Sequence, residues 1–363
     1  MAEKVLLVTV LKKGRYKHSL KEEADEMQEL IRSAGGVVVA DVVAAIEKPS
    51  PSHYIHSGKV EEFRRKRFES KANLTIFSVD LSPVQSRNLE GACGSRVVDR
   101  TGLILDIFAR RAQSSEGRLQ VELAQLNYLL PRLVGQGVLL SRLGGGIGTR
   151  GPGEQKLEVN RRKIRDRISR IKDELKKVGR HRELLRKSRK RKDFSLVAIV
   201  GYTNAGKSSL LNALTGASAL VEDKLFATLD PTTRLFMTPH SKKILLTDTV
   251  GFLQNLPHHL IEAFKATLEE VTEADSLIHV LDISNPSVDT QYRAVNQLLE
   301  QLGARNKPTI LALNKIDLLG EAQLNRIADK FQGGIPISVK AKLHFDQLIQ
   351  KIESVVDSLV PTV

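Results

Sequence analysis

The stretch Gly201-Tyr-Thr-Asn-Ala-Gly-Lys-Ser208 decides the fold of the C-terminal part of the chain. It follows an apolar, strand-like run at residues 195–200, and leucines at helical spacing come directly after it. The pattern G-x-x-x-x-G-K-S between a strand and a helix predicts a phosphate-binding loop, or P-loop, whose glycines let backbone N–H groups turn toward phosphates. We expect Lys207 to reach the β- and γ-phosphates of a nucleotide and the Ser208 hydroxyl to bind Mg²⁺.

Two further motifs follow in the order that a guanine-nucleotide site requires, each after a strand-like run. They are Asp248-Thr-Val-Gly251, a D-x-x-G motif, and Asn314-Lys-Ile-Asp317, an N-K-x-D motif. We expect Asp248 to hold Mg²⁺ through water and the Gly251 N–H to sense the γ-phosphate. The Asp317 carboxylate can accept hydrogen bonds from N1–H and the 2-amino group of guanine, which adenine lacks. Together the motifs predict a site for guanine nucleotides.

Two weaker elements complete the predicted site. The run Ser338-Val-Lys340 resembles an S-A-K element, whose backbone contacts guanine O6. For the Mg²⁺-binding threonine of the first switch the candidates are Thr228, Thr232 and Thr233. Thr228 lies twenty residues from both the P-loop serine and the D-x-x-G aspartate, the usual spacing, so we select it. The predicted metal ligands are Ser208, Thr228 and, through water, Asp248. The predicted nucleotide contacts are Gly201, Tyr202, Thr203, Asn204, Ala205, Gly206, Lys207, Ser208, Phe226, Ala227, Thr228, Leu229, Asp230, Asp248, Thr249, Val250, Gly251, Asn314, Lys315, Asp317, Ser338, Val339 and Lys340.

The positive charge of the chain is concentrated in one segment. The net charge is +14 over 363 residues, and residues 155–192 contain eighteen Lys and Arg against five Asp and Glu. A local excess of this size favours a polyanionic partner. The chain has one cysteine, Cys93, expected to be a small buried residue, and a reducing cytoplasm suits this composition. We find no signal pattern and no apolar stretch long enough to span a membrane, so a cytoplasmic protein is expected.

The first hundred residues alternate between strand-like and helix-like patterns. Such alternation predicts a small, mostly parallel α/β domain, and no catalytic constellation is evident in it. The expected strands are residues 5–10, 37–43, 74–80 and 97–98, and the expected helices are residues 20–31, 58–70 and 83–91.

Two heptad repeats flank a glycine-rich segment in the middle of the chain. Leucines from Leu119 to Leu133 form one seam, and apolar residues from Leu157 to Val178 form the other. We expect an antiparallel helical hairpin with residues 135–153, which contain eight glycines, as its flexible tip. The segment follows a helix rather than a strand, and no Lys-Ser or Lys-Thr pair opens the next helix, so it is not a second P-loop. The basic residues expected to contact RNA phosphates are Arg142, Arg150, Arg161, Arg162, Lys163 and Arg165.

These patterns predict an α/β chain in three parts. Residues 1–115 form an N-terminal α/β subdomain, and residues 116–192 form the basic hairpin. Residues 193–363 form a P-loop GTPase domain, with a mostly parallel sheet and helices on both faces.

With these motifs in place, the chain resembles the HflX family of translation-factor-related GTPases. The resemblance extends over nearly the whole chain. It rests on Ser141-Arg-Leu-Gly-Gly-Gly-Ile-Gly-Thr-Arg-Gly-Pro-Gly-Glu154, the P-loop, Phe226-Ala-Thr-Leu-Asp-Pro-Thr-Thr-Arg234, Asp248-Thr-Val-Gly-Phe252 and Asp99-Arg-Thr-Gly-Leu-Ile-Leu-Asp-Ile-Phe108. It implies binding to the large ribosomal subunit, where family members split stalled or idle ribosomes in the GTP state; some use ATP as well or remodel RNA. The chain ends soon after the GTPase domain, so the role of an extra C-terminal domain in some relatives is not carried over.

The residue after the D-x-x-G motif bears on hydrolysis. Many GTPases have a glutamine there that orients the attacking water, and this chain has Phe252. We therefore expect slow intrinsic hydrolysis that a partner accelerates; no catalytic residue is assigned. Asn204 matches a position that holds K⁺ in some related GTPases, and the alternative is that it only braces the P-loop.

The leading hypothesis is a monomeric, GTP-switched factor that binds the ribosome through its basic hairpin. One alternative is a signalling GTPase whose hairpin binds an anionic membrane or an acidic protein, but neither a lipidation motif nor a broad apolar membrane face supports it. The other alternative is an RNA-remodelling NTPase.

Overall fold

The computed structural model describes residues 2–12, 17–133, 152–190, 194–216, 225–226, 228–254, 260 and 265–359. These residues form two compact units. The first unit consists of Met1–Arg110 with Arg118–Lys177, and the second of Arg111–Gly117 with Val178–Val363. The predicted three-part division stays a prediction.

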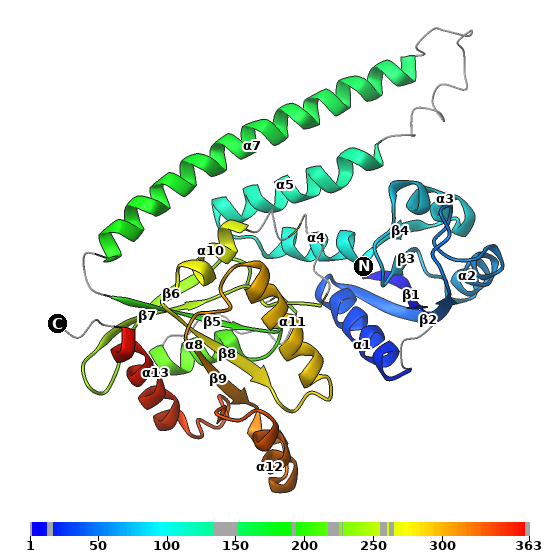
Figure 1. Ribbon diagram of the computed structural model, residues 1–363. Coiled ribbons are helices and arrows are strands. Elements are labelled where there is room, and N and C mark those ends of the chain that lie inside the picture. The colour runs from blue at the N-terminus through cyan, green and yellow to red at the C-terminus, as the bar shows by residue number, and fades with distance from the viewer. Residues whose placement is uncertain are drawn as a thin grey trace. The chain divides into compact units, whose positions relative to one another are not determined.

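The first unit contains a four-stranded parallel sheet in the order β2-β1-β3-β4 (Figure 1). Its strands are β1 (Glu3–Lys12), β2 (Gly36–Ile46), β3 (Leu74–Phe77) and β4 (Arg96–Val98). The helices between and after them are α1 (Lys17–Ser33), α2 (Ser57–Ser70), α3 (Pro83–Cys93) and α4 (Arg100–Arg111). Helix α3 begins where expected because Ser82 and Gln85 form a capping box and Pro83 occupies the first turn. The predicted small parallel α/β fold is confirmed, and Cys93 is buried.

Two long helices follow the sheet, α5 (Ser115–Arg132) and α7 (Pro152–Lys190). Leu123 packs with Ile168 and Ile171, and the neighbouring seam residues Leu119, Leu126, Leu130, Ile164 and Leu175 pack against them. The Arg167 guanidinium donates two hydrogen bonds of 2.7 Å to the Glu122 carboxylate. Arg182, later in α7, pairs with Glu116, earlier in α5, so the helices run antiparallel. The predicted pairing of the two seams is confirmed over the described residues.

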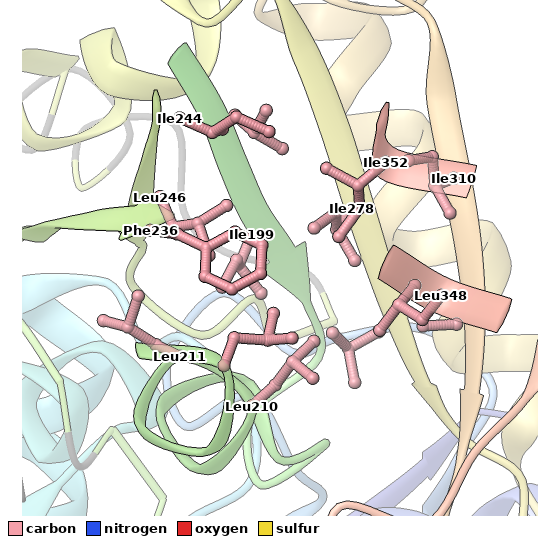
Figure 2. Packing of buried hydrophobic residues seen from close by; sticks show 14 of the residues in the cluster. Ile199, Leu210, Leu211, Phe236, Ile244, Leu246, Ile278, Ile310, Leu348 and Ile352 are labelled. Atoms are coloured by element: carbon pink, nitrogen blue, oxygen red, sulfur yellow. The ribbon is translucent and has the colours of Figure 1, made fainter. Parts of the chain in front are cut away.

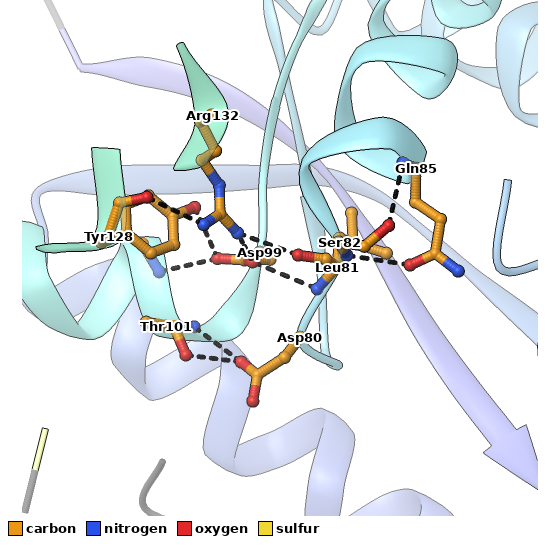
Figure 3. Close-up of polar contacts among 9 residues, drawn as sticks. Asp80, Leu81, Ser82, Gln85, Asp99, Thr101, Tyr128 and Arg132 are labelled. Carbon is orange, nitrogen blue, oxygen red and sulfur yellow. Dashed lines mark hydrogen bonds and ion pairs between the residues drawn. The ribbon is translucent and has the colours of Figure 1, made fainter. Parts of the chain in front are cut away.

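A buried aspartate fixes the C-terminal end of α5 within the first unit (Figure 3). Asp99 Oδ2 accepts hydrogen bonds from Arg132 Nη2 at 2.8 Å and from the Leu81 N–H at 3.1 Å. Its Oδ1 accepts from the Tyr128 hydroxyl at 2.8 Å and from the Gly102 N–H at 2.8 Å. The Arg132 guanidinium lies 3.5 Å from the centre of the Tyr128 ring. Burial raises the pKa of Asp99, and these donors and the Arg132 charge oppose that rise.

The second unit contains a six-stranded sheet in the order β10-β9-β8-β5-β7-β6, parallel except for the antiparallel edge strand β6 (Figure 1). Its strands are β5 (Ser195–Gly201), β6 (Thr232–Met237), β7 (Lys243–Asp248), β8 (Ser276–Asp282), β9 (Thr309–Asn314) and β10 (Ile335–Pro336). Its helices are α8 (Lys207–Thr215), α10 (Lys265–Glu273), α11 (Val288–Gln301), α12 (Glu321–Lys330) and α13 (Phe345–Leu359), with a short 3₁₀ turn at Ile316–Leu318.

Helices cover both faces of this sheet. On one face, leucines and isoleucines of α8 and α13 pack with Ile199, Ile278 and Ile310 of the central strands (Figure 2). On the other face, Leu281 and Leu313 pack with residues of α11 and α12. Alternate residues of a strand point to opposite faces, and burying each such side chain stabilises the fold by roughly 1.5–3 kcal/mol. The predicted fold class, α/β with a mostly parallel sheet covered on both faces, is confirmed.

Within the described part of the chain, no helix combines the length and the apolar character that a membrane crossing needs.

Candidate functional site

The P-loop lies between β5 and α8, at the carboxyl end of a central strand. Gly206 adopts φ +98°, and a Cβ at this position would lie 2.4 Å from Asn314 Nδ2. A side chain here would be strained by the backbone conformation and blocked by the asparagine, so the position requires glycine. The loop leads directly into the N-terminus of α8, where free backbone N–H groups favour an anion.

Lys207 begins α8 and is buried under the P-loop. Its Nζ donates a hydrogen bond of 2.8 Å to the Tyr202 carbonyl oxygen. Burial lowers the pKa of Lys207 to about 8, while the nearby Asp248 charge acts in the opposite direction. A buried ammonium at the end of the P-loop is suited to receive an anionic phosphate.

Three oxygen-bearing side chains from three segments meet beside this lysine. The Ser208 hydroxyl lies 2.6 Å from Asp248 Oδ2 and 2.9 Å from Thr228 Oγ1, and Thr228 Oγ1 lies 3.0 Å from the same Asp248 oxygen. Asp248 is buried, and among the residues that the structure describes its Oδ1 atom has no hydrogen-bond partner. Burial raises the pKa of Asp248, with Lys207 as the main opposing influence. Hydroxyl and carboxylate oxygens in this arrangement are the donors that Mg²⁺ prefers.

The structure separates the three candidate threonines of the first switch. Thr228 contacts Ser208 and Asp248, whereas the Thr233 hydroxyl lies 2.9 Å from the hydroxyl of Thr247, in the sheet. Thr232 begins strand β6. The spacing argument and the geometry therefore point to the same threonine.

The segment after β7 is attached to the P-loop through its backbone. The Phe252 N–H donates to the Gly201 carbonyl oxygen at 3.1 Å, and the Phe252 carbonyl oxygen accepts from the Thr203 N–H at 2.9 Å. A Cβ added to Gly251 would lie 3.2 Å from Lys207 Nζ, so this glycine lies against the lysine predicted to bind phosphate. The Phe252 side chain is buried, and it has no hydrogen-bonding group with which to orient a water molecule.

The predicted base-recognition loops come together on the other side of the P-loop. Asn314 Nδ2 donates to the Ala205 carbonyl oxygen at 2.8 Å, and Asn314 Oδ1 accepts from the Val339 N–H at 3.1 Å. The Ser338 hydroxyl donates to Asp317 Oδ1 at 2.5 Å. Lys315 Nζ pairs with Asp282 Oδ2 at 2.7 Å. Asn314 thus braces both loops, and Ser338 orients the carboxylate expected to bind guanine.

The remaining predicted contacts comprise further nucleotide contacts, the basic residues of α7 and three residues outside the described part of the chain. The Tyr202 hydroxyl accepts a hydrogen bond from the Gln254 N–H at 3.1 Å, and Thr249 Oγ1 donates to the Ile199 carbonyl oxygen at 2.7 Å. The side chains of Phe226, Leu229 and Val250 are buried, and Lys340 is exposed. Of the basic residues on α7, Arg162, Lys163 and Arg165 are exposed and Arg161 is partly exposed. Ala227, Arg142 and Arg150 lie outside the described residues.

One contact near the site was missed by the sequence interpretation. Asp230 is predicted to contact nucleotide, but its carboxylate binds Gln113 and Ser114, which precede α5. The available signal was a glycine, Gly117, in the first turn of a predicted helix, where helix propensity disfavours it.

This protein is a P-loop GTPase. It combines a P-loop, a cluster of Ser, Thr and Asp oxygens, and a predicted base-recognition loop held by an asparagine, all on a mostly parallel sheet. Three family descriptions match consecutive parts of the chain: "GTP-binding GTPase N-terminal" at residues 21–109, "GTP-binding GTPase Middle Region" at 111–189 and "50S ribosome-binding GTPase" at 196–315. GTPase HflX of Caldanaerobacter subterraneus subsp. tengcongensis is 51% identical over 351 residues, covering 97% of this chain and 80% of the relative. The chain belongs to the GTPase HflX family.

Other relatives agree with this assignment. GTPase HflX of Escherichia coli is 44% identical over 333 residues, covering 91% of this chain and 78% of the relative. The crystal structure of the SsGBP and GDP complex matches with a TM-score of 0.53 and 26% identity, over 98% of this chain and 99% of that chain. The resemblance stated from the sequence is confirmed, and the protein is a GTPase.

Proposed function

We propose that this GTPase binds the large ribosomal subunit in its GTP-bound state and splits or rescues stalled or idle ribosomes. The observation that carries the proposal is the combination, in one chain, of a complete set of guanine-nucleotide motifs with the exposed basic helix α7. The matching family description, "50S ribosome-binding GTPase", supports the same partner.

Magnesium is the metal proposed for the oxygen cluster. Ser208 and Thr228 would bind it directly, and Asp248 would bind it through water. A bound Mg²⁺ would neutralise negative charge on the β- and γ-phosphates. Thr228 would then respond to the γ-phosphate. In the GTP state the γ-phosphate helps to bind the Mg²⁺ that holds the threonine in place, and GDP lacks that phosphate.

Hydrolysis is proposed to be slow until a partner completes the site. Lys207 and the N-terminus of α8 hold the phosphates, but Phe252 offers no hydrogen bond to the attacking water. Rapid GTP hydrolysis by the purified protein alone in sodium buffer would contradict this proposal. A potassium ion at Asn204, which adopts φ +61° in the P-loop, is a further prediction. A comparison of hydrolysis rates in potassium and sodium buffers tests it.

The proposed ribosome contact is electrostatic. Arg162, Lys163 and Arg165 project from α7 into solvent, and residues 155–192 have eighteen basic against five acidic residues. Such a helix fits the phosphates of folded RNA, and each phosphate contact adds to the salt dependence of binding.

Cosedimentation of the full chain with isolated large subunits tests the proposal. We expect binding with a non-hydrolysable GTP analogue, weaker binding with GDP, and loss of binding as salt rises. Replacing Arg162, Lys163 and Arg165 with Glu should weaken binding without changing GTP affinity. The matched control reverses Arg64 and Arg65, exposed basic residues on α2. Equal binding in both nucleotide states, or none, would refute the proposal, and nucleotide-independent binding to free RNA would favour the RNA-remodelling alternative.

A further inference from the structure

Asp230 makes three hydrogen bonds to the residues that precede helix α5. Its Oδ2 accepts from the Gln113 N–H at 2.9 Å and from the Ser114 N–H at 2.7 Å. Its Oδ1 accepts from the Ser114 hydroxyl at 2.5 Å. We call this set of contacts the clasp. All of its residues belong to the second unit.

The clasp also acts on the start of the helix. Ser114 precedes the first residue of α5, and its Oγ accepts a hydrogen bond from the Gly117 N–H at 2.8 Å, as an N-cap residue does. The Asp230 carboxylate therefore binds the capping residue itself, at the helix end where the macrodipole favours negative charge. Release of Asp230 would leave the backbone N–H groups of Gln113 and Ser114 without this acceptor.

Asp230 is joined to the metal cluster by a very short piece of chain. Thr228, two residues earlier, contacts Ser208 and Asp248, and the intervening Leu229 is buried. A movement of Thr228 away from the cluster cannot leave Asp230 in place unless Leu229, the one residue between them, rearranges. The position of the threonine and the state of the clasp are therefore mechanically linked.

Gly117 is matched to the clasp. A Cβ at this position would lie only 2.2 Å from Asp230 Oδ1 and 3.0 Å from the Ser114 hydroxyl oxygen. Glycine is a poor helix former, and an alanine would favour the helix at this position. The glycine therefore leaves room for the aspartate at the expense of local helix propensity.

The same turn of α5 contacts the second long helix. Glu116 pairs with Arg182 of α7, and Arg182 Nη2 also lies 3.7 Å from Glu269 Oε2 of α10. Residues 113–117 thus connect Asp230 to the first turn of α5 and to Arg182 in the C-terminal part of α7. All of these residues belong to the second unit.

We propose that Asp230 is a positioning residue that couples the metal-binding state of Thr228 to the start of helix α5. With GTP and Mg²⁺ bound, Thr228 is held at the cluster and Asp230 holds Gln113 and Ser114. Without the γ-phosphate, the segment is released and the clasp opens. By linkage, a closed clasp favours GTP over GDP, and GTP favours a closed clasp. This inference rests on the proposed role of Thr228 in the GTP state.

The test compares affinities of the full chain for a fluorescent GTP analogue and for GDP in the presence of Mg²⁺. Asp230→Ala should lower affinity for the GTP analogue about tenfold and leave GDP affinity within about twofold, which is the range of an ordinary coupling between sites. Asp230→Asn should recover most of the loss, because its amide oxygen can still accept both backbone N–H groups. Asp289→Ala is the matched control, since it removes an exposed ion pair with Lys330 in the same unit.

A double-mutant cycle separates the clasp from a general loss of fold. Gly117→Ala should reproduce the effect of Asp230→Ala, and the double variant should be no worse than Asp230→Ala alone. Circular dichroism and thermal unfolding check that each variant is folded. Equal losses for GTP analogue and GDP, or additive effects in the double variant, would overturn the proposal. Thr228→Ala distinguishes failure of the coupling through Asp230 from failure of the proposed role of Thr228. If this variant leaves the affinity for the GTP analogue unchanged, the proposed role of Thr228 in the GTP state is wrong.

Discussion

Helix α5 is held by an aspartate at each end, and the two aspartates differ in burial and in setting. Asp99, at the C-terminal end, is buried in the first unit between β4 and α4 and binds Arg132, Tyr128 and two backbone N–H groups (Figure 3). Asp230, at the N-terminal end, is only partly buried and lies two residues from a proposed metal ligand. Opening the Asp99 contacts would cost a large free energy, whereas the Asp230 contacts can open at a modest free-energy cost.

The difference follows from physical chemistry. A buried carboxylate that loses its partners leaves uncompensated charges, and this penalty keeps the Asp99 contacts closed. A partly exposed carboxylate can exchange its partners for water at little cost. A partly exposed aspartate therefore suits a switch, and a buried one suits a structural anchor. Five substitutions test this contrast.

Lys207→Ala should remove nucleotide binding and with it every nucleotide-dependent difference in the second unit. Truncating one side of a buried charge interaction costs about 3 kcal/mol or more, which is a loss of affinity of at least about 100-fold. Isothermal titration with GDP measures it. Urea unfolding of the first unit should be unaffected, and retained GDP affinity would show that Lys207 is not at the phosphates.

Asp317→Asn should reverse base preference within the second unit. Asparagine has an N–H₂ group where the carboxylate oxygen would accept a hydrogen bond from guanine. GTP affinity should therefore fall on the order of 100-fold, and xanthine nucleotides should bind better. Competition between GTP and XTP for the same site measures the change. Full GTP affinity in this variant would remove Asp317 from base recognition.

Asp99→Ala should destabilise the first unit by about 3 kcal/mol, because Arg132 loses its buried partner. Urea unfolding followed by circular dichroism measures this loss. The ratio of GTP-analogue to GDP affinity should stay unchanged. A changed ratio with unchanged stability would invert the contrast between the two aspartates.

Asp230→Ala should show the opposite pattern. Its effect on stability should be less than about 1 kcal/mol, since the carboxylate is partly exposed. The discrimination between GTP analogue and GDP should fall about tenfold, equivalent to about 1.4 kcal/mol. Measuring unfolding and affinity on the same preparation separates the two readouts. A loss of stability as large as that of Asp99→Ala would make Asp230 a structural anchor.

Ser114→Ala should give the smallest effect, a reduction of discrimination of about two- to fivefold. It removes the hydroxyl contact but leaves both backbone N–H groups available to Asp230, and one hydrogen bond contributes about 0.5–1 kcal/mol. The fluorescent-nucleotide titration used for Asp230 measures it. An effect larger than that of Asp230→Ala would show that Ser114 acts chiefly as a helix cap.

Much of the second unit could be predicted from sequence because its chemistry is local. The P-loop, D-x-x-G and N-K-x-D motifs each place a few residues after one strand, and parallel strands bring those ends together. The two heptad seams likewise predicted that α5 and α7 pack, since an apolar repeat identifies the buried face of a helix. The choice of Thr228 as the switch threonine, made from spacing, stays a prediction, and Thr228 does lie beside Ser208 and Asp248.

The two aspartate contacts of α5 could not be predicted in this way. Asp230 and Ser114 are 116 residues apart in the sequence, and Asp99 and Arg132 are 33 apart. Periodicity reports which face of an element is buried, but it does not identify the polar partner of a particular carboxylate. Asp230 was accordingly assigned to the nucleotide. The predicted contacts of the glycine-rich tip, Arg142 and Arg150, lie outside the described residues and stay predictions.

Hydrogen exchange at the amides of Gln113 and Ser114 tests most directly whether nucleotide state reaches helix α5. In the wild-type protein we expect exchange at these amides to be about tenfold slower with a GTP analogue and Mg²⁺ than with GDP, because the clasp is closed only in the first state. In Asp230→Ala the difference should disappear. Equal protection of these two amides in both nucleotide states of the wild-type protein would contradict the coupling.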